Sequence, residues 1–99
     1  MEAPITYEFS ASVWRHPSPA GWYFVSLPAG MSTEIRNHLK WQEEGWGRIK
    51  ARAKVGTSSW QTAIWFDTKR GTYLLPIRSD IRKKECIGIG SELRVQVLI

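Results

Sequence analysis

The sequence predicts a mostly β domain, a small barrel of about six strands with two short helices. Apolar and polar residues alternate over most of the 99-residue chain, which is the pattern of half-buried strands. Clusters of glycine and proline separate the alternating stretches and mark the turns between them. One strand–helix–strand pattern occurs twice, so we expect a single domain, residues 1–99, with two pseudo-symmetric halves.

The alternation is most regular at residues 48–55, where Ile49, Ala51, Ala53 and Val55 share one face and basic residues share the other. The other strands are predicted at residues 5–14, 22–27, 59–67, 72–75 and 92–99. Short helices are expected at residues 33–42 and 80–86, because Ser32 and Ser79 are suitable N-caps.

The repeated pattern consists of a strand, a Leu-Pro pair, a capped helix, glycines and a second strand. It spans about residues 22–55 and again about residues 72–99. Leu27-Pro28 and Leu75-Pro76 end the first strand of each copy, because proline has no N–H to donate to a ladder. The same order in both copies indicates that the two halves are related.

Two family resemblances follow from these motifs. Leu75-Pro76-Ile77-Arg78, Arg82 and the segment from Gly88 to Val95 resemble the AbrB/MazE-type swapped-hairpin half-barrel, with Ser91 where that family usually has Asp. Over nearly the whole chain, the order of motifs resembles a bacterial family described only as domain of unknown function 1905. That resemblance implies a double-split β-barrel with two half-barrel units in one chain, and it implies no activity. The residues that carry it include Phe9-Ser10-Ala11, Trp14, Gly21-Trp22-Tyr23-Phe24-Val25, Leu27-Pro28, Gly47, Trp60-Gln61-Thr62, Gly71-Thr72-Tyr73-Leu74-Leu75-Pro76, Arg82 and Gly90.

The composition is that of a soluble globular protein. Fourteen basic residues against nine acidic ones give a net charge of +5, which permits nucleic-acid or acidic partners without establishing them. One cysteine excludes an internal disulfide framework. No apolar run reaches the ~20 residues of a membrane helix, and the segment Met1-Glu2-Ala3-Pro4 has no feature of a secretory signal. We therefore expect a cytoplasmic protein with no membrane partner.

No group of residues indicates catalysis. His16 and His38 have no neighbouring histidine or cysteine at metal-ligand spacing, so they are interpreted as a solvent-facing loop residue and a partly buried helix residue. Cys86 is best explained as a buried or half-buried thiol. The chain has no Gly-x-Ser-x-Gly motif and no glycine-rich phosphate loop. The sequence therefore predicts no enzyme, no catalytic or metal-binding residues and no cofactor.

Six tryptophans in 99 residues are several-fold more than usual. Trp22 and Trp60 are predicted to lie in the core. A barrel of this size cannot enclose every ring, so some of the others should line a surface groove or an interface, where aromatic and arginine side chains bind proteins or single-stranded nucleic acids. The candidates for such exposed indoles are Trp14, Trp41, Trp46 and Trp65.

Arg48, Lys50, Arg52 and Lys54 form what we call the basic stripe. They project from one strand face about 6.6 Å apart, twice the rise of a strand, and no acidic residue interrupts them. The stripe can be a solvated face that prevents strand pairing, a surface that follows phosphates, or a surface for an acidic protein. Lys69 and Arg70 add further positive charge at a predicted turn.

The leading hypothesis is a non-catalytic binding module that uses an aromatic and basic surface for a protein, peptide or small ligand. The alternative is a domain that binds nucleic acid without sequence specificity. AbrB-type proteins bind DNA, but their DNA-contacting residues do not map onto this sequence, so that activity is not transferred. The candidate binding residues are Arg48, Lys50, Arg52, Lys54, Trp14, Trp65, Lys69 and Arg70.

Overall fold

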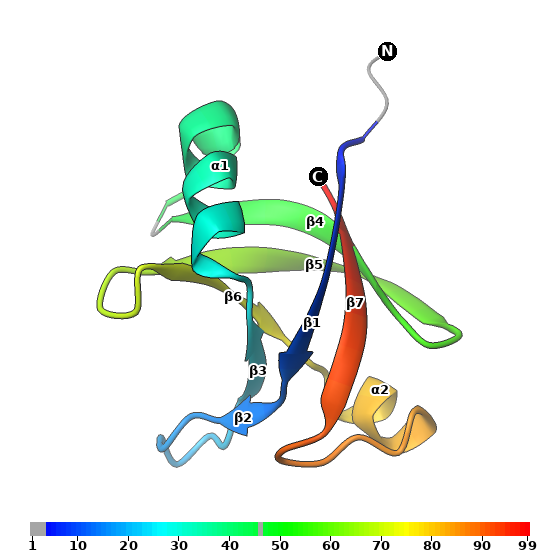
Figure 1. Ribbon diagram of the computed structural model, residues 1–99. Helices are drawn as coiled ribbons and strands as arrows, with labels where there is room; N and C mark the ends of the chain where they lie inside the picture. The colour runs from blue at the N-terminus through cyan, green and yellow to red at the C-terminus, as the bar shows by residue number, and fades with distance from the viewer. Residues whose placement is uncertain (1–3, 46) are drawn as a thin grey trace.

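A computed structural model of the protein describes residues 4–45 and 47–99. It has seven antiparallel strands in one sheet that curls into a half-barrel (Figure 1). The predicted mostly β class is confirmed, whereas the predicted number of six strands is wrong. The strands are β1 (Thr6–Ser12), β2 (Trp14–Arg15), β3 (Tyr23–Ser26), β4 (Arg48–Val55), β5 (Ser58–Asp67), β6 (Thr72–Pro76) and β7 (Glu92–Leu98), in the sheet order β1-β7-β4-β5-β6-β3-β2.

The additional strand arises because the first predicted strand is divided at Val13. On one side of this residue β1 pairs with β7, and on the other side β2 pairs with β3. The Val13 N–H donates to the carbonyl oxygen of Ser91 at 2.9 Å, and the Gly90 N–H donates to the Val13 carbonyl at 2.8 Å. The two edge strands of the sheet, β1 and β2, are therefore consecutive in the chain and are joined by Val13, which is almost fully buried.

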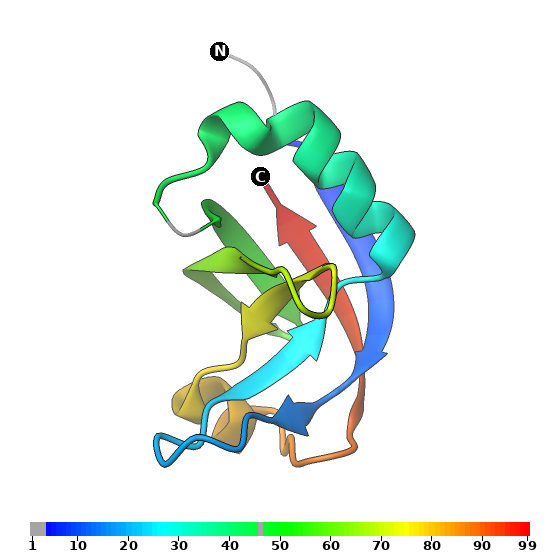
Figure 2. The same ribbon diagram turned by 90° about the vertical axis from the view of Figure 1, so that its left-hand side faces the viewer.

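Two helices lie at opposite ends of the curled sheet (Figure 2). The longer one, α1 (Ala29–Leu39), continues into a short 3-10 turn, Lys40–Gln42, and the shorter one is α2 (Ser79–Lys84). In the part of the chain that the structure describes, no helix is both long and apolar enough to span a membrane. Each of the two predicted repeat segments has the strand–helix–strand order, β3-α1-β4 in one and β6-α2-β7 in the other.

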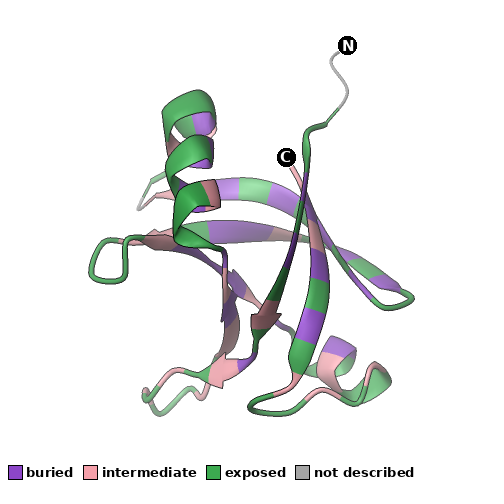
Figure 3. Ribbon diagram, viewed as in Figure 1, coloured by how far each residue is buried: buried purple, intermediate pink, exposed green. Residues whose placement is uncertain are grey.

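The core lies inside the curl and is formed by every second residue of the strands. On β4, Ile49, Ala51, Ala53 and Val55 are buried while the basic stripe is exposed, as the alternating colours along β4 in Figure 3 show. The predicted faces of this strand are confirmed. The strands β1, β5, β6 and β7 and the helix α1 contribute most of the rest of this single cluster, including Phe9, Ile35, Trp60, Ile64, Tyr73, Leu75, Val95 and Val97, and β3 and α2 add Val25 and Ile81.

Ser32 is not the N-cap of α1, because the helix begins at Ala29 and Pro28 occupies the capping position. Ser32 is instead fully buried within the helix. Its hydroxyl accepts a hydrogen bond from the Tyr73 N–H at 3.0 Å and lies 3.5 Å from the Leu27 carbonyl oxygen, to which it donates. This serine therefore attaches α1 to β6. Ser79 is also not a cap, since α2 begins at that residue and Arg78 precedes it.

Three side chains that were predicted to be buried or half-buried are exposed. Trp22 is 50% exposed because it shares the outer face of the sheet with Phe24, and its strand is apolar on both faces. His38 lies on the solvent side of α1. Cys86 follows α2 at a left-handed residue, φ 55°, and its thiol is exposed. His16 is half-buried, because its ring lies 6.4 Å from those of Trp14 and Phe24.

The faces of β4 predict opposite effects for neighbouring glutamate substitutions. Ala53→Glu should lower the free energy of unfolding by about 3 kcal/mol or more, because it places an unpaired charge in the core. Lys54→Glu should change it by about 0.5 kcal/mol or less, because the side chain stays in solvent. Urea denaturation of both variants checks this, and equal effects would contradict the assigned faces.

The buried hydrogen bonds of Ser32 predict that Ser32→Ala loses about 1–3 kcal/mol of stability, since the Tyr73 N–H is left buried without a partner. Thr33→Ala is the matched control. The Thr33 hydroxyl donates to the Ala29 carbonyl on the exposed side of the same helix, so its removal should have little effect. Thermal denaturation compares them, and similar melting temperatures would show that Ser32 does not attach the helix.

Candidate binding groove

The sheet separates between β5 and β6 after only three paired positions. Trp65 pairs with Leu74, Phe66 with Tyr73 and Asp67 with Thr72. Continuing this register would place Pro76 opposite Ala63, and proline has no N–H to continue the ladder. On its other side β6 stays paired with β3, where the Ile77 N–H donates to the Tyr23 carbonyl at 2.8 Å. The chain after Pro76 therefore follows β3 and leaves β5.

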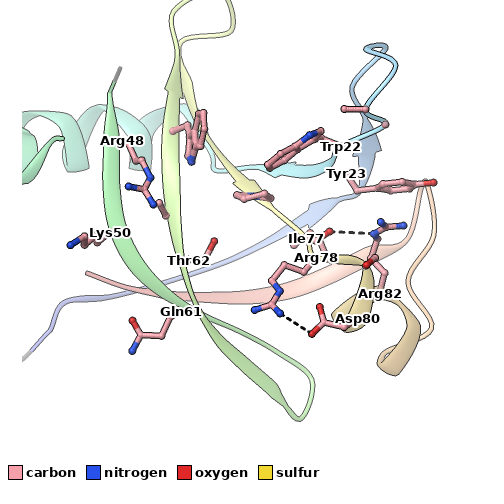
Figure 4. A pocket seen from close by; sticks show the side chains of 16 residues that line it. Trp22, Tyr23, Arg48, Lys50, Gln61, Thr62, Ile77, Arg78, Asp80 and Arg82 are labelled. Atoms are coloured by element: carbon pink, nitrogen blue, oxygen red, sulfur yellow. Dashed lines mark hydrogen bonds and ion pairs between the residues drawn. The ribbon is translucent and has the colours of Figure 1, made fainter. Parts of the chain in front are cut away.

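A groove of about 950 Å³ opens where the two strands separate. Its volume lies within the range of small-molecule sites. One wall comes from the adjoining strands β4 and β5, and the other from residues 20–23 and 76–82 (Figure 4). Thr62 and Ala63 of β5 and Ile77 of the opposite wall line the groove between them.

Four cationic side chains line this groove, against one acidic residue, Asp80. Arg48 and Lys50 come from β4 and share Glu44, at 3.3 and 3.5 Å from its two carboxylate oxygens. Arg78 pairs with Asp80 at 3.2 Å. These three side chains are largely solvated, so their ion pairs are weak and can be exchanged for a ligand.

Arg82 is held more firmly than the other three cations. Its Nε donates to the Ile77 carbonyl oxygen at 3.2 Å, and its guanidinium carbon lies 3.7 Å from the centre of the Tyr23 ring. The hydrogen bond and the cation–π contact fix the direction of the side chain beside the groove. Figure 4 shows Arg82 and Arg78 on the same wall, with their hydrogen bonds dashed.

Aromatic rings continue from the groove across the outer face of the sheet. Trp22 and Trp65 line the groove with ring centres 6.5 Å apart, and Phe24 stacks on Trp22 at 6.1 Å. These three rings enclose a smaller apolar hollow of about 100 Å³. Trp22 and Trp65 remain 50% and 43% exposed, which leaves apolar surface available next to the cations.

The end of the separation far from Trp65 is closed by Glu85, which follows α2. Its carboxylate accepts hydrogen bonds from the hydroxyls of Ser58 at 2.6 Å and Thr57 at 3.2 Å. Gly56 has φ 58°, and a Cβ there would overlap the Glu85 carboxylate unless that side chain moved, so the turn between β4 and β5 favours glycine. The hydrogen bonds from Ser58 and Thr57 lower the pKa of Glu85 against the smaller effect of its desolvation.

The groove contains three of the eight predicted binding residues, Arg48, Lys50 and Trp65. Arg52 and Lys54 extend along the same exposed face of β4 but do not line it. Trp41 is 77% exposed in the short 3-10 turn that follows α1 and does not line the groove, and Trp46 lies outside the described residues. Trp60 is buried in the core, as predicted.

The other three predicted residues, Trp14, Lys69 and Arg70, lie beside one another away from the groove. The Arg70 guanidinium lies 4.2 Å over the Trp14 ring and pairs with Asp67 at 2.7 Å. Burial raises the pKa of Asp67, but hydrogen bonds from Arg70 and from the Lys69 N–H outweigh it and hold the pKa below its usual value. Trp14 also donates to the Ser26 hydroxyl at 3.0 Å, so this indole is partly covered.

Sequence reasoning missed the other four aromatic and cationic residues that line the groove: Trp22, Tyr23, Arg78 and Arg82. Arg78 and Arg82 belong to the motif that follows Leu75-Pro76, which was interpreted only as a sign of the fold. Their position after a strand-ending proline is the signal that could have identified them.

The arrangement can attract an anion and hold a flat or apolar group beside it. Among residues 4–45 and 47–99, no three His, Cys, Asp or Glu side chains come close enough together to bind a metal ion. Comparison with known protein families shows that a family model described as domain of unknown function (DUF1905) matches residues 9–97. It confirms the resemblance to that family. No curated protein matches the chain.

The lowered pKa of Glu85 predicts a pH-dependent effect of Glu85→Gln. Because the folded protein holds this pKa below its ordinary value of 4.5, the stabilisation is complete above that value and is lost as the pH falls through the lowered one. The variant should melt at a lower temperature than the wild type near neutral pH, and the difference should shrink below pH 4.5. Melting curves between about pH 3 and pH 7 check this. A difference that stays constant would contradict it.

Proposed function

Because the chain belongs to the DUF1905 family, whose description assigns no activity, we propose a function from the groove itself: a non-catalytic binding module. Its ligand carries negative charge and a flat or apolar group, and it belongs to a protein, a peptide or a small molecule. The observation that supports this best is the placement of Arg48, Lys50, Arg78 and Arg82 around a groove that also exposes Trp22 and Trp65.

The groove explains features that the fold alone does not need. Trp22 and Trp65 each expose nearly half of their surface on the outer face, and neither belongs to the core cluster. Apolar surface next to arginine is typical of interaction sites. The cations are arranged around a concavity, where their charges act together on one ligand.

The alternative function is binding of nucleic acid without sequence specificity. It is favoured by the basic stripe, which continues past the groove from Arg48 to Lys54 with every second side chain exposed. In this function the whole stripe follows phosphates, and Trp65 stacks on an unpaired base. The two functions differ in whether Arg52 and Lys54 contribute to binding.

Two further features belong to the proposal. We propose that the segments 22–55 and 72–99 are related halves of a double-split barrel, distantly similar to AbrB/MazE-type half-barrels, and that the β5–β6 separation is one of its splits. Superposition of the two segments tests the relation. We also propose a cytoplasmic location, since the exposed thiol of Cys86 suits a reducing compartment.

The groove predicts that Arg48→Gln/Lys50→Gln weakens binding of 8-anilinonaphthalene-1-sulfonate, an anion with flat aromatic rings. Losing two solvated charges should lower the affinity about fivefold or more. The matched control is Arg52→Gln/Lys54→Gln, which removes the same charges from the same strand outside the groove. Fluorescence titration of the folded variants measures both affinities. Equal effects of the two double variants would contradict binding in the groove.

An octamer of deoxythymidine tests the alternative in the same variants by fluorescence anisotropy over a salt series. If the stripe follows phosphates, both double variants should lower the salt slope, by about one unit for each lost contact. Binding that depends only on Arg48 and Lys50 would assign the nucleic acid to the groove and reject the stripe.

A further inference from the structure

The groove exposes a stretch of β5 that is paired with β4 on one side and has no partner strand on the other. In β5 the Phe66 N–H donates towards β4, to the Gly47 carbonyl at 3.0 Å, whereas the Asp67 carbonyl accepts from Gly71 on the β6 side. The main-chain groups of successive strand residues point to opposite sides. Gln61 and Ala63 therefore direct their N–H and C=O groups away from β4, into the separation.

On the side of β5 that faces away from β4, no strand of the described chain pairs with these two residues. The register would bring Pro76 and Arg78 there, but the chain after Pro76 remains with β3 and then turns into α2. Gln61 is exposed, and Ala63, only 3% exposed, lies where the separation begins. Main-chain groups without partners in such a place are stabilised by any group that can hydrogen-bond to them.

The separation is long enough for a short strand. It runs from the last β5–β6 pair at Trp65 to the hydrogen bond between Ser58 and Glu85. The residues between them span about 20 Å at the rise of an extended chain. An extended peptide of about five residues matches this length and would place alternate side chains on the two faces of the sheet.

The lining determines which peptide fits. Arg48, Lys50 and Arg78 surround the separation with positive charge, and the one acid in the lining, Asp80, is already paired with Arg78. Trp22 and Trp65 flank the end at which β5 and β6 meet, where they would contact an apolar or aromatic side chain. A DNA backbone carries charge but no donors for the Gln61 and Ala63 carbonyls, and an RNA backbone has only its 2′-hydroxyls, whereas a peptide offers donors and acceptors in the required alternation.

We propose that the groove binds an extended acidic segment of another protein, which adds to the sheet as a strand beside Gln61 and Ala63 of β5. The inference rests on the proposed binding function and names its ligand class. The main chain of the segment supplies hydrogen bonds to β5, its acidic side chains reach Arg48, Lys50 and Arg78, and one apolar side chain contacts Trp22 and Trp65.

The test begins with an array of synthetic heptapeptides that carry Glu or Asp at alternate positions and apolar residues between them. The tightest binder is then made in two N-methylated forms, each methylated at every second backbone nitrogen. Strand addition uses the N–H groups of one set only, so one form should bind about tenfold or more weakly and the other should bind about as well as the parent. Equal losses in the two forms would overturn the proposal, and this comparison leaves the protein unchanged.

Gln61→Pro tests the same contact from the protein. It removes the N–H that faces the groove and none that faces β4, and Gln61→Ala is its control, since it removes the side chain but keeps the N–H. The proline variant should bind the peptide about threefold to tenfold more weakly than the alanine variant.

The outcomes separate this proposal from the function on which it rests. If no acidic peptide binds while anilinonaphthalene sulfonate still depends on Arg48 and Lys50, the groove binds anions but not strands. If the thymidine octamer binds in the groove and the peptides do not, the ligand is a nucleic acid and the proposal is overturned. If neither anion depends on the groove, both proposals fail.

Discussion

The missing N–H of Pro76 is the constraint on which the rest of the structure depends. It stands where β6 would next pair with β5, and its nitrogen faces β5 rather than β3. Pairing with β5 therefore ends while pairing with β3 continues. One proline in this position therefore keeps β6 paired with β3 and lets β6 separate from β5, which opens the groove.

The two faces of the sheet differ in what their side chains contact: inner side chains pack in the core, and outer ones line the groove. The inner residues of β4 and β5, such as Ile49 and Ile64, form a continuous core that passes beneath the opening. The outer residues Arg48, Lys50 and Trp65 stand on the same strands but do not belong to that core. Stability and the proposed contact with a ligand therefore fall on alternate residues of one strand, so the outer set can change without loss of the fold.

The sequence predicts a feature correctly where the residues that determine it are close together in the chain. The faces of β4 follow from strict alternation over eight residues, and both its buried and its exposed side chains were predicted correctly. Ser32 was misread as a cap because its partner, the Tyr73 N–H, lies 41 residues away. The division at Val13 depends on pairing with two distant strands. Trp22 was wrongly predicted to lie in the core, because residues 22–27 are apolar on both faces and do not show which face is buried. The groove itself results from a register between β5 and β6 that no local pattern contains.

The pairing of β1 with β7 has a consequence for how the molecule folds. This ladder joins residues 6–12 to residues 92–98, and its Arg94–Glu8 ion pair spans 86 residues of sequence. The β4–β5 hairpin is local, with a tight turn at Gly56 and Thr57, and can form during synthesis. Strand β1 has no partner strand until residues 92–98 of β7 have left the ribosome. Closing so long a loop requires a large loss of chain entropy, so joining of the first strand to the last should be late and should limit the folding rate.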